Sequence, residues 1–196
     1  MNFGEPITPQ VASQWLASVE NAHVAAELQA LFAEAHDAIV ARGPACWASG
    51  RCCNFAKAGH RLYVTGLEAA WTVVHAKQRA SASTLQRDET KGSARLALPQ
   101  VPQLSQQSIA QALERGDCPF LVANACSVHD IKPLACRVYF CDQSAQDWQH
   151  TLSESLQTKL KGLHESHGIP YSYAEWRTLL KVLEEVADSG GASAQA

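Results

Sequence analysis

The residues of this chain best suited to chemistry are its seven cysteines, which fall into two short groups. Three lie in Cys46–Cys53, which reads CWASGRCC, and four lie in Cys118–Cys141, which reads CPFLVANACSVHDIKPLACRVYFC. Thiolate sulfur is a soft ligand that binds zinc, copper(I) and iron–sulfur clusters in preference to magnesium or calcium. We therefore expect the two groups to close on one another around a metal centre.

The spacing of the cysteines argues against a small zinc finger. Such sites use ligand pairs two to four residues apart, and only Cys136 and Cys141 are separated by four residues. The adjacent Cys52 and Cys53 are awkward ligands for one ion, because neighbouring side chains diverge. An iron–sulfur cube tolerates wider spacing and is usually held by four cysteines. The expected cofactor is therefore an iron–sulfur cluster of the 4Fe–4S type, with zinc as the alternative.

All seven cysteines are candidate metal ligands. The order of preference is Cys52, Cys53, Cys126 and Cys136 first, then Cys46 and Cys118, and last Cys141. His129, three residues after Cys126, is a further candidate, and His164 and His167 are close enough in sequence to share a metal. Basic residues that could offset thiolate charge are Arg51, Lys132 and Arg137, and aromatic residues that could exclude solvent are Trp47, Phe55, Phe120, Tyr139 and Phe140.

Composition limits the partners and the cellular location that we expect for this protein. The formal net charge of −3 gives no electrostatic reason to expect a nucleic-acid partner. No apolar run approaches the roughly 20 residues that span a bilayer, so no membrane association is expected. The N-terminal MNFGEPITPQ lacks the pattern of a secretory signal. We expect a cytoplasmic protein. In such proteins clustered thiols bind metals more often than they form disulfides. The sequence does not identify its protein partner.

The elements that must position the cysteines are predominantly helical. Apolar periodicity predicts one long helix or a broken pair over residues 9–42, a short helix over Ser105–Arg115, and two amphipathic helices over Asp147–His167 and Ser172–Ala187. Thr65 and Glu68 form a capping-box pattern, which predicts a helix that continues to about Arg79. Between the helices we expect a loop over Cys46–His60, strand-like alternation over Arg61–Thr65 and a mobile connection over Ala80–Gln103.

The predicted fold class is mainly α, a single helical domain over residues 1–196 with irregular cysteine-rich loops. It comprises a metal-binding core over 44–142, C-terminal helices over 145–187 and a disordered tail over 189–196. The only β-structure we expect beyond Arg61–Thr65 is a small hairpin near Phe120–Val128.

The order and the residue types of the two motifs resemble those of the YkgJ-type cysteine-cluster family, whose members are described as a zinc- or iron-chelating domain. The first motif is Cys46–Cys53, with Ser49 where the family pattern has a cysteine. The second is Cys118-Pro119-Phe120-Leu121 followed by Cys126–Arg137, with His129 in place of a tyrosine and Lys132 in place of an arginine. The resemblance covers roughly Cys46 to Cys141 and includes Thr65–Glu68 between the motifs.

The resemblance implies metal chelation and leaves three functions open. The first is an iron–sulfur or other metal centre with a role in electron transfer, sensing or maturation of another protein. The second is a structural zinc module. The third is a cluster-dependent protein-modifying enzyme, because flagellin lysine N-methylases share a similar cysteine signature. The sequence contains no P-loop, Gly-rich nucleotide loop or radical S-adenosylmethionine motif, so enzymatic activity stays an open question.

Overall fold

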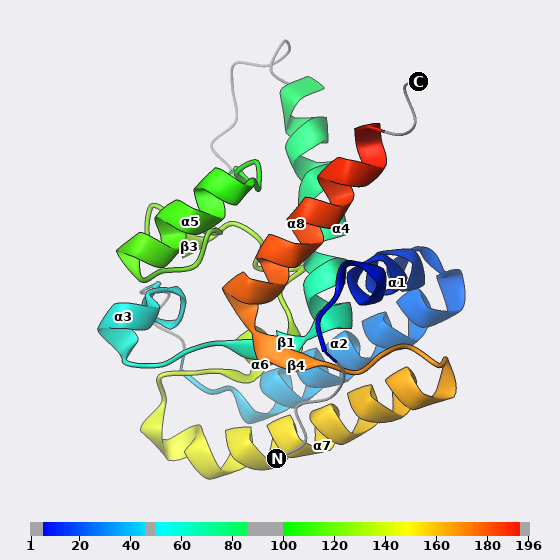
Figure 1. The fold of residues 1–196 in the computed structure, drawn as a ribbon. Helices are drawn as coiled ribbons and strands as arrows, with labels where there is room; N and C mark the ends of the chain where they lie inside the picture. The colour runs from blue at the N-terminus through cyan, green and yellow to red at the C-terminus, as the bar shows by residue number, and fades with distance from the viewer. Residues whose placement is uncertain (1–5, 46–49, 86–99, 193–196) are drawn as a thin grey trace.

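The helices of this computed structural model, which describes residues 6–45, 50–85 and 100–192, pack around one hydrophobic core. Two of the longest helices, α2 (Ala22–Arg42) and α7 (Gln146–Ser166), lie side by side. A second group consists of α1 (Pro9–Glu20), α4 (Gly66–Leu85) and α8 (Trp176–Ala192), which pack against one another (Figure 1). The prediction of a mainly α, single-domain fold is confirmed. None of the described helices is both long and apolar enough to cross a membrane.

The N-terminal helical stretch is a broken pair. Thr8 caps α1 by accepting a hydrogen bond from Val11 N at 3.3 Å. Asn21 ends α1 and also starts α2, since its Oδ1 accepts from His23 N at 3.0 Å. A side chain that competes for backbone donors in this way favours a helix boundary over a helix interior. Gly43, in the left-handed region at φ 60°, ends α2.

A short antiparallel sheet joins two strand–helix junctions near the middle of the molecule (Figure 1). Strand β1 (Tyr63–Thr65) leads directly into α4, and β4 (Tyr173–Glu175) leads directly into α8. Each junction also donates a backbone hydrogen bond to the residue that precedes the other strand. Gly66 N donates to Ser172 O at 3.1 Å, and Trp176 N donates to Leu62 O at 2.9 Å. The strand-like pattern before Thr65 was predicted, whereas β4 was not. Three residues are too few for a visible alternation, and their partner lies far away in the sequence.

The predicted hairpin is present and close to its expected position. Strands β2 (Leu121–Val122) and β3 (Ala125–Cys126) pair so that Leu121 faces Cys126. Helix α5 (Gln106–Arg115) precedes the hairpin, with Ser105 as its N-cap and Gly116 as its C-cap. Two short elements follow, α6 (Leu134–Val138) and a 3₁₀ turn over Gln143–Ala145.

Three boundaries differ from the sequence-based expectation. Part of the loop predicted over Cys46–His60 is helical: a 3₁₀ turn covers Arg51–Cys53, and α3 covers Phe55–Ala58, where the Asn54 side chain caps Lys57 N at 3.3 Å. Helix α4 continues past Arg79 to Leu85, so the predicted connection begins later, and its residues 86–99 lie outside the described residues. Helix α8 extends into the predicted tail as far as Ala192, and Ser189 Oγ donates to Glu185 O at 2.9 Å.

Trp15 anchors α1 to both junctions. Its indole is fully buried, and Nε1 donates to Pro170 O at 2.7 Å. A Cβ added to Gly66 would lie 2.2 Å from Trp15 Cε2, so glycine is required where α1 crosses the start of α4. The same core includes Cys53 and Cys118, which places the cysteine segments at its margin rather than in a separate unit.

Candidate metal centre

Backbone hydrogen bonds hold the two cysteine segments side by side. Cys118 N donates to Cys53 O at 2.8 Å, and Ala56 N donates to Gly116 O at 2.8 Å. The segment around Cys53 thus runs along the segment that enters the β2–β3 hairpin. These hydrogen bonds bring cysteines that are far apart in the sequence close to one another.

A close contact between Gly50 and the hairpin turn adds to this arrangement. Gly50 has φ 67°, and a Cβ at this position would lie 2.4 Å from Asn124 O. In the turn itself, Ala123 and Asn124 both have positive φ, at 49° and 61°. Such left-handed pairs give two-residue hairpin turns their tight geometry. The close approach therefore requires glycine on one side and a tight turn on the other.

The Cys53 thiol lies at the centre of a group of thiols. Hydrogen bonding with the thiols of Cys118, Cys126 and Cys52, together with burial, raises the pKa of Cys53 far above its usual range. The same interaction acts in the opposite direction on its partners. Cys53 lowers the pKa of Cys52 to about 6 and that of Cys126 to about 7. A protonated Cys53 has one S–H group and can donate to one neighbouring thiolate at a time.

Cys136 completes what we call the thiol cluster: Cys52, Cys53, Cys118, Cys126 and Cys136. Burial raises the pKa of Cys136 well above 9.0, and the nearby Cys118 and Cys126 raise it further. Within the cluster Cys53 and Cys118 are buried, Cys126 and Cys136 are partly buried, and Cys52 is exposed. The cluster therefore reaches from the edge of the core to the surface.

Lys132 is a cation that acts on several thiols of the cluster. Its charge lowers the pKa values of Cys52, Cys126 and Cys136, although other causes are larger at each thiol. Its Nζ also lies 3.1 Å from Nε2 of the exposed His129. Burial, followed by the charge of Lys132, lowers the pKa of His129. The structure thus places His129 beside the cation.

Arg137 interacts electrostatically with Cys136 and also has a structural role. Its Nε donates to Lys132 O at 2.9 Å and its Nη2 to Asp130 O at 2.6 Å. The guanidinium group also lies 4.2 Å from the centre of the Phe32 ring. These contacts order the turn before α6, so Arg137 shapes the loop that carries Lys132. Of the aromatic residues expected to exclude solvent, Phe55 and Phe120 are buried, whereas Tyr139 is 42% exposed.

The last two cysteines stand differently. Cys141 is partly buried and is not among the thiols that act on Cys53. Cys46 lies outside the described residues, as does Ser49. Ala45 precedes Cys46 and Asp142 follows Cys141. These two neighbours are in contact, because Ala45 N donates to Asp142 Oδ2 at 3.1 Å.

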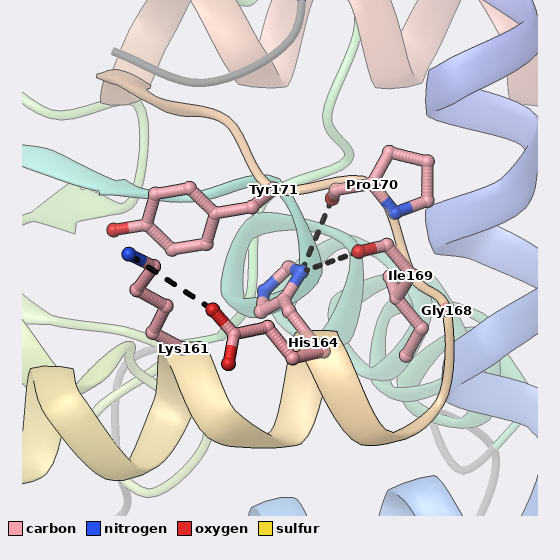
Figure 2. Close-up of a pocket in the computed structure, with 7 residues that line it drawn as sticks. Lys161, His164, Gly168, Ile169, Pro170 and Tyr171 are labelled. Atoms are coloured by element: carbon pink, nitrogen blue, oxygen red, sulfur yellow. Dashed lines mark hydrogen bonds and ion pairs between the residues drawn. The ribbon is translucent and has the colours of Figure 1, made fainter. Parts of the chain in front are cut away.

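His164 and His167 do not face a common point. His164 is buried, with Nδ1 at 3.1 Å from Pro170 O and 3.3 Å from Ile169 O, as Figure 2 shows. Two carbonyl acceptors require the proton on Nδ1. His167 points elsewhere, with Nε2 3.1 Å from Glu27 Oε1. A hollow of about 300 Å³ beside His164 is lined by Lys161, His164, Glu165 and the segment 168–171. His164 therefore holds the loop that follows α7.

The donor set of the thiol cluster fits a metal centre by its chemistry. It offers soft sulfur ligands, two of which ionise readily, beside a compensating lysine. Within the described residues, however, no three His, Cys, Asp or Glu side chains are arranged to hold one metal ion as they stand. Comparison with protein-family models, curated proteins and solved structures finds no match to this chain. The resemblance to the cysteine-cluster family thus rests on the motif residues alone.

Proposed function

We propose that the thiol cluster binds a metal centre, with an iron–sulfur cluster of the 4Fe–4S type as the first candidate and zinc as the alternative. The ligands would be drawn from Cys52, Cys53, Cys118, Cys126 and Cys136. The proposed role is electron transfer, sensing or maturation of another protein, in a cytoplasmic setting. When bound, an iron–sulfur cluster would supply one-electron chemistry or an oxygen-sensitive signal.

A single observation carries this proposal. The Cys53 thiol interacts with thiols on both sides of the paired backbone segments, Cys52 on its own side and Cys118 and Cys126 on the other. Thiols gathered in this way destabilise one another's ionised forms unless a proton or a metal is shared among them. Interaction with Cys53 lowers the pKa of Cys52 to about 6 and that of Cys126 to about 7, which favours thiolates at these two positions. A soft cation would supply the positive charge that balances them.

Anaerobic isolation followed by iron, sulfide and zinc analysis and an absorption spectrum tests the proposal. Iron and sulfide in equal amounts, with broad visible absorption, would support the iron–sulfur form. One equivalent of zinc, with loss of the fold on chelation, would support the structural zinc module instead. Colourless protein that binds neither iron nor zinc after anaerobic reconstitution would refute both.

Single Cys→Ser variants identify the ligands. Changes within the thiol cluster should lower the metal content, most of all at Cys53, which interacts with three other thiols. Cys141→Ser is the matched control, because this thiol is partly buried but stands apart from the interactions around Cys53. Equal metal content in the Cys53→Ser and Cys141→Ser proteins would show that the metal is held elsewhere.

A further inference from the structure

Helix α6, which carries Cys136, depends on another helix for its start. With five residues it is too short to be stable alone, and its N-cap residue, Pro133, provides no side-chain cap. The first helical donor, Leu134 N, instead bonds Glu68 Oε1 at 2.8 Å. Glu68 lies in the first turn of α4. A side chain from a distant part of the chain thus caps the helix that bears a cluster thiol.

Both oxygens of the Glu68 carboxyl group are held in place. While Oε1 accepts from Leu134 N, Oε2 accepts from Thr65 N and Thr65 Oγ1, both at 2.9 Å. The capping box predicted from the sequence is therefore present, but it uses only one of the two oxygens. Glu68 is fully buried. A buried carboxyl group with three donors around it is costly to move and has one defined orientation.

The same helix holds the residues before α6 at two further points. Thr72 Oγ1, one turn after Glu68, donates to Ile131 O at 3.0 Å. Arg79 forms a bidentate ion pair with Asp130. Going along α4, the contacts are made to Leu134, then Ile131, then Asp130, so the segment runs antiparallel to the helix. We call Glu68, Thr72 and Arg79 the α4 anchor residues.

We propose that Glu68 is a positioning residue for the metal centre. By capping α6, it places the Cys136 thiol among the other thiols. This inference rests on the proposed function for its meaning, but not for its first test. The backbone hydrogen bond from Cys118 N to Cys53 O positions these two cysteines without a contact to α4. Loss of Glu68 should therefore displace Cys136 selectively.

The first test uses metal-free protein and measures the alkylation rate of each cysteine with iodoacetamide by mass spectrometry. In Glu68→Ala, Cys136 should react at least about tenfold faster than in the unaltered protein, while Cys118 changes by less than about threefold, since a shift of about 1.4 kcal/mol in local opening corresponds to tenfold. Glu68→Met, which keeps the approximate length of the side chain but offers Leu134 N no acceptor oxygen, provides the same comparison if the alanine variant does not fold.

Two controls separate positioning from general loosening. Thr65→Ala removes the hydroxyl group of the capping box but leaves Leu134 N on Glu68, so Cys136 should stay protected. Glu184→Ala removes another buried carboxyl group, away from the thiols. Its Oε2 lies 3.1 Å from Lys77 Nζ. Cys118 and Cys136 rising together in Glu68→Ala, or Cys136 remaining protected in it, would overturn the inference.

The second test adds Co(II) and records the thiolate-to-metal absorption. Glu68→Ala should lose the same share of this absorption as Cys136→Ser, and combining the two changes should cause no further loss. Absence of Co(II) absorption in the unaltered protein would count against the proposed function, while the alkylation result would still decide the role of Glu68. Full absorption in Glu68→Ala would refute the positioning role.

Discussion

At the scale of single residues, a buried histidine has a specific structural task. The buried His164 donates from Nδ1 to the carbonyl groups that follow α7, while its Nε2 has no partner in the described part of the chain. A protonated ring would place a donor and a charge at Nε2 with nothing to receive them. Burial accordingly lowers the pKa of His164 from 6.5.

This shift predicts acid sensitivity. Because the folded-state pKa of His164 lies below its unfolded value, the unfolded state binds the proton first as the pH falls. Its effect on stability is absent above pH 6.5 and grows as the pH falls toward the folded pKa. Each pH unit in that interval should cost up to about 1.4 kcal/mol. Urea unfolding at several pH values should show this slope.

His164→Asn should flatten that pH dependence, since an asparagine amide can donate as Nδ1 does but cannot be protonated. His36→Asn, on the exposed side of α2, is the control and should leave the slope as it is. An unchanged slope in His164→Asn would mean that other groups cause the acid sensitivity.

At the scale of elements, the apposition of the cysteine segments depends on Gly50. Gly50→Ala should cost the left-handed strain of about 1–2 kcal/mol and also force the Cβ against Asn124 O. Gly59→Ala is the matched control, because Gly59 has a similar φ of 71° with nothing within 4 Å of an added Cβ. Unfolding free energy and metal content should both fall further in Gly50→Ala. Equal effects in the two variants would show that the close approach is unimportant.

The crossing of α1 over α4 gives a second element-scale prediction. Gly66→Ala should destabilise the protein by at least about 2 kcal/mol, because the added methyl group meets the buried Trp15 ring. Gly162→Ala, within α7 and with open space around it, should instead stabilise the protein by about 0.5–1 kcal/mol. Denaturant midpoints for the two variants should move in opposite directions. A loss of stability in both would contradict the contact at Gly66.

Much of this element structure could be predicted from the sequence, because helix periodicity and capping are local signals. The helical stretch over 9–42, expected as one helix or a broken pair, the helix expected over Ser105–Arg115, and the Thr65–Glu68 capping box are examples. The β1–β4 pairing was not predictable, since its strands are short and distant in sequence. Nor was the contact of Glu68 with Leu134, because the capping box alone already accounted for that carboxyl group.

At the scale of the whole molecule, the candidate site lies at the edge of the core, where backbone hydrogen bonds pair the segments around Cys53 and Cys118. The sequence motifs grouped the cysteines, but residue spacing does not show which side chains act on one another. Cys118, placed in the second rank of candidate ligands, pairs with Cys53 through its backbone N and raises the pKa of the Cys53 thiol, and Lys132 acts on Cys52, Cys126 and Cys136. These distinctions depend on three-dimensional placement, which residue spacing does not contain.

The placement predicts that metal binding and folding are coupled. A ligand that binds only the folded protein at 100 times its Kd adds about 2.7 kcal/mol to the unfolding free energy, and less if the unfolded thiols also bind it. Urea unfolding of the metal-free protein, with and without zinc under reducing conditions, should show this increase, and a chelator should reverse it. Cys53→Ser should abolish the increase, because it removes the thiol that interacts with both segments. Cys141→Ser should retain most of it. An increase that survives in Cys53→Ser would mean that the metal stabilises the fold from another position.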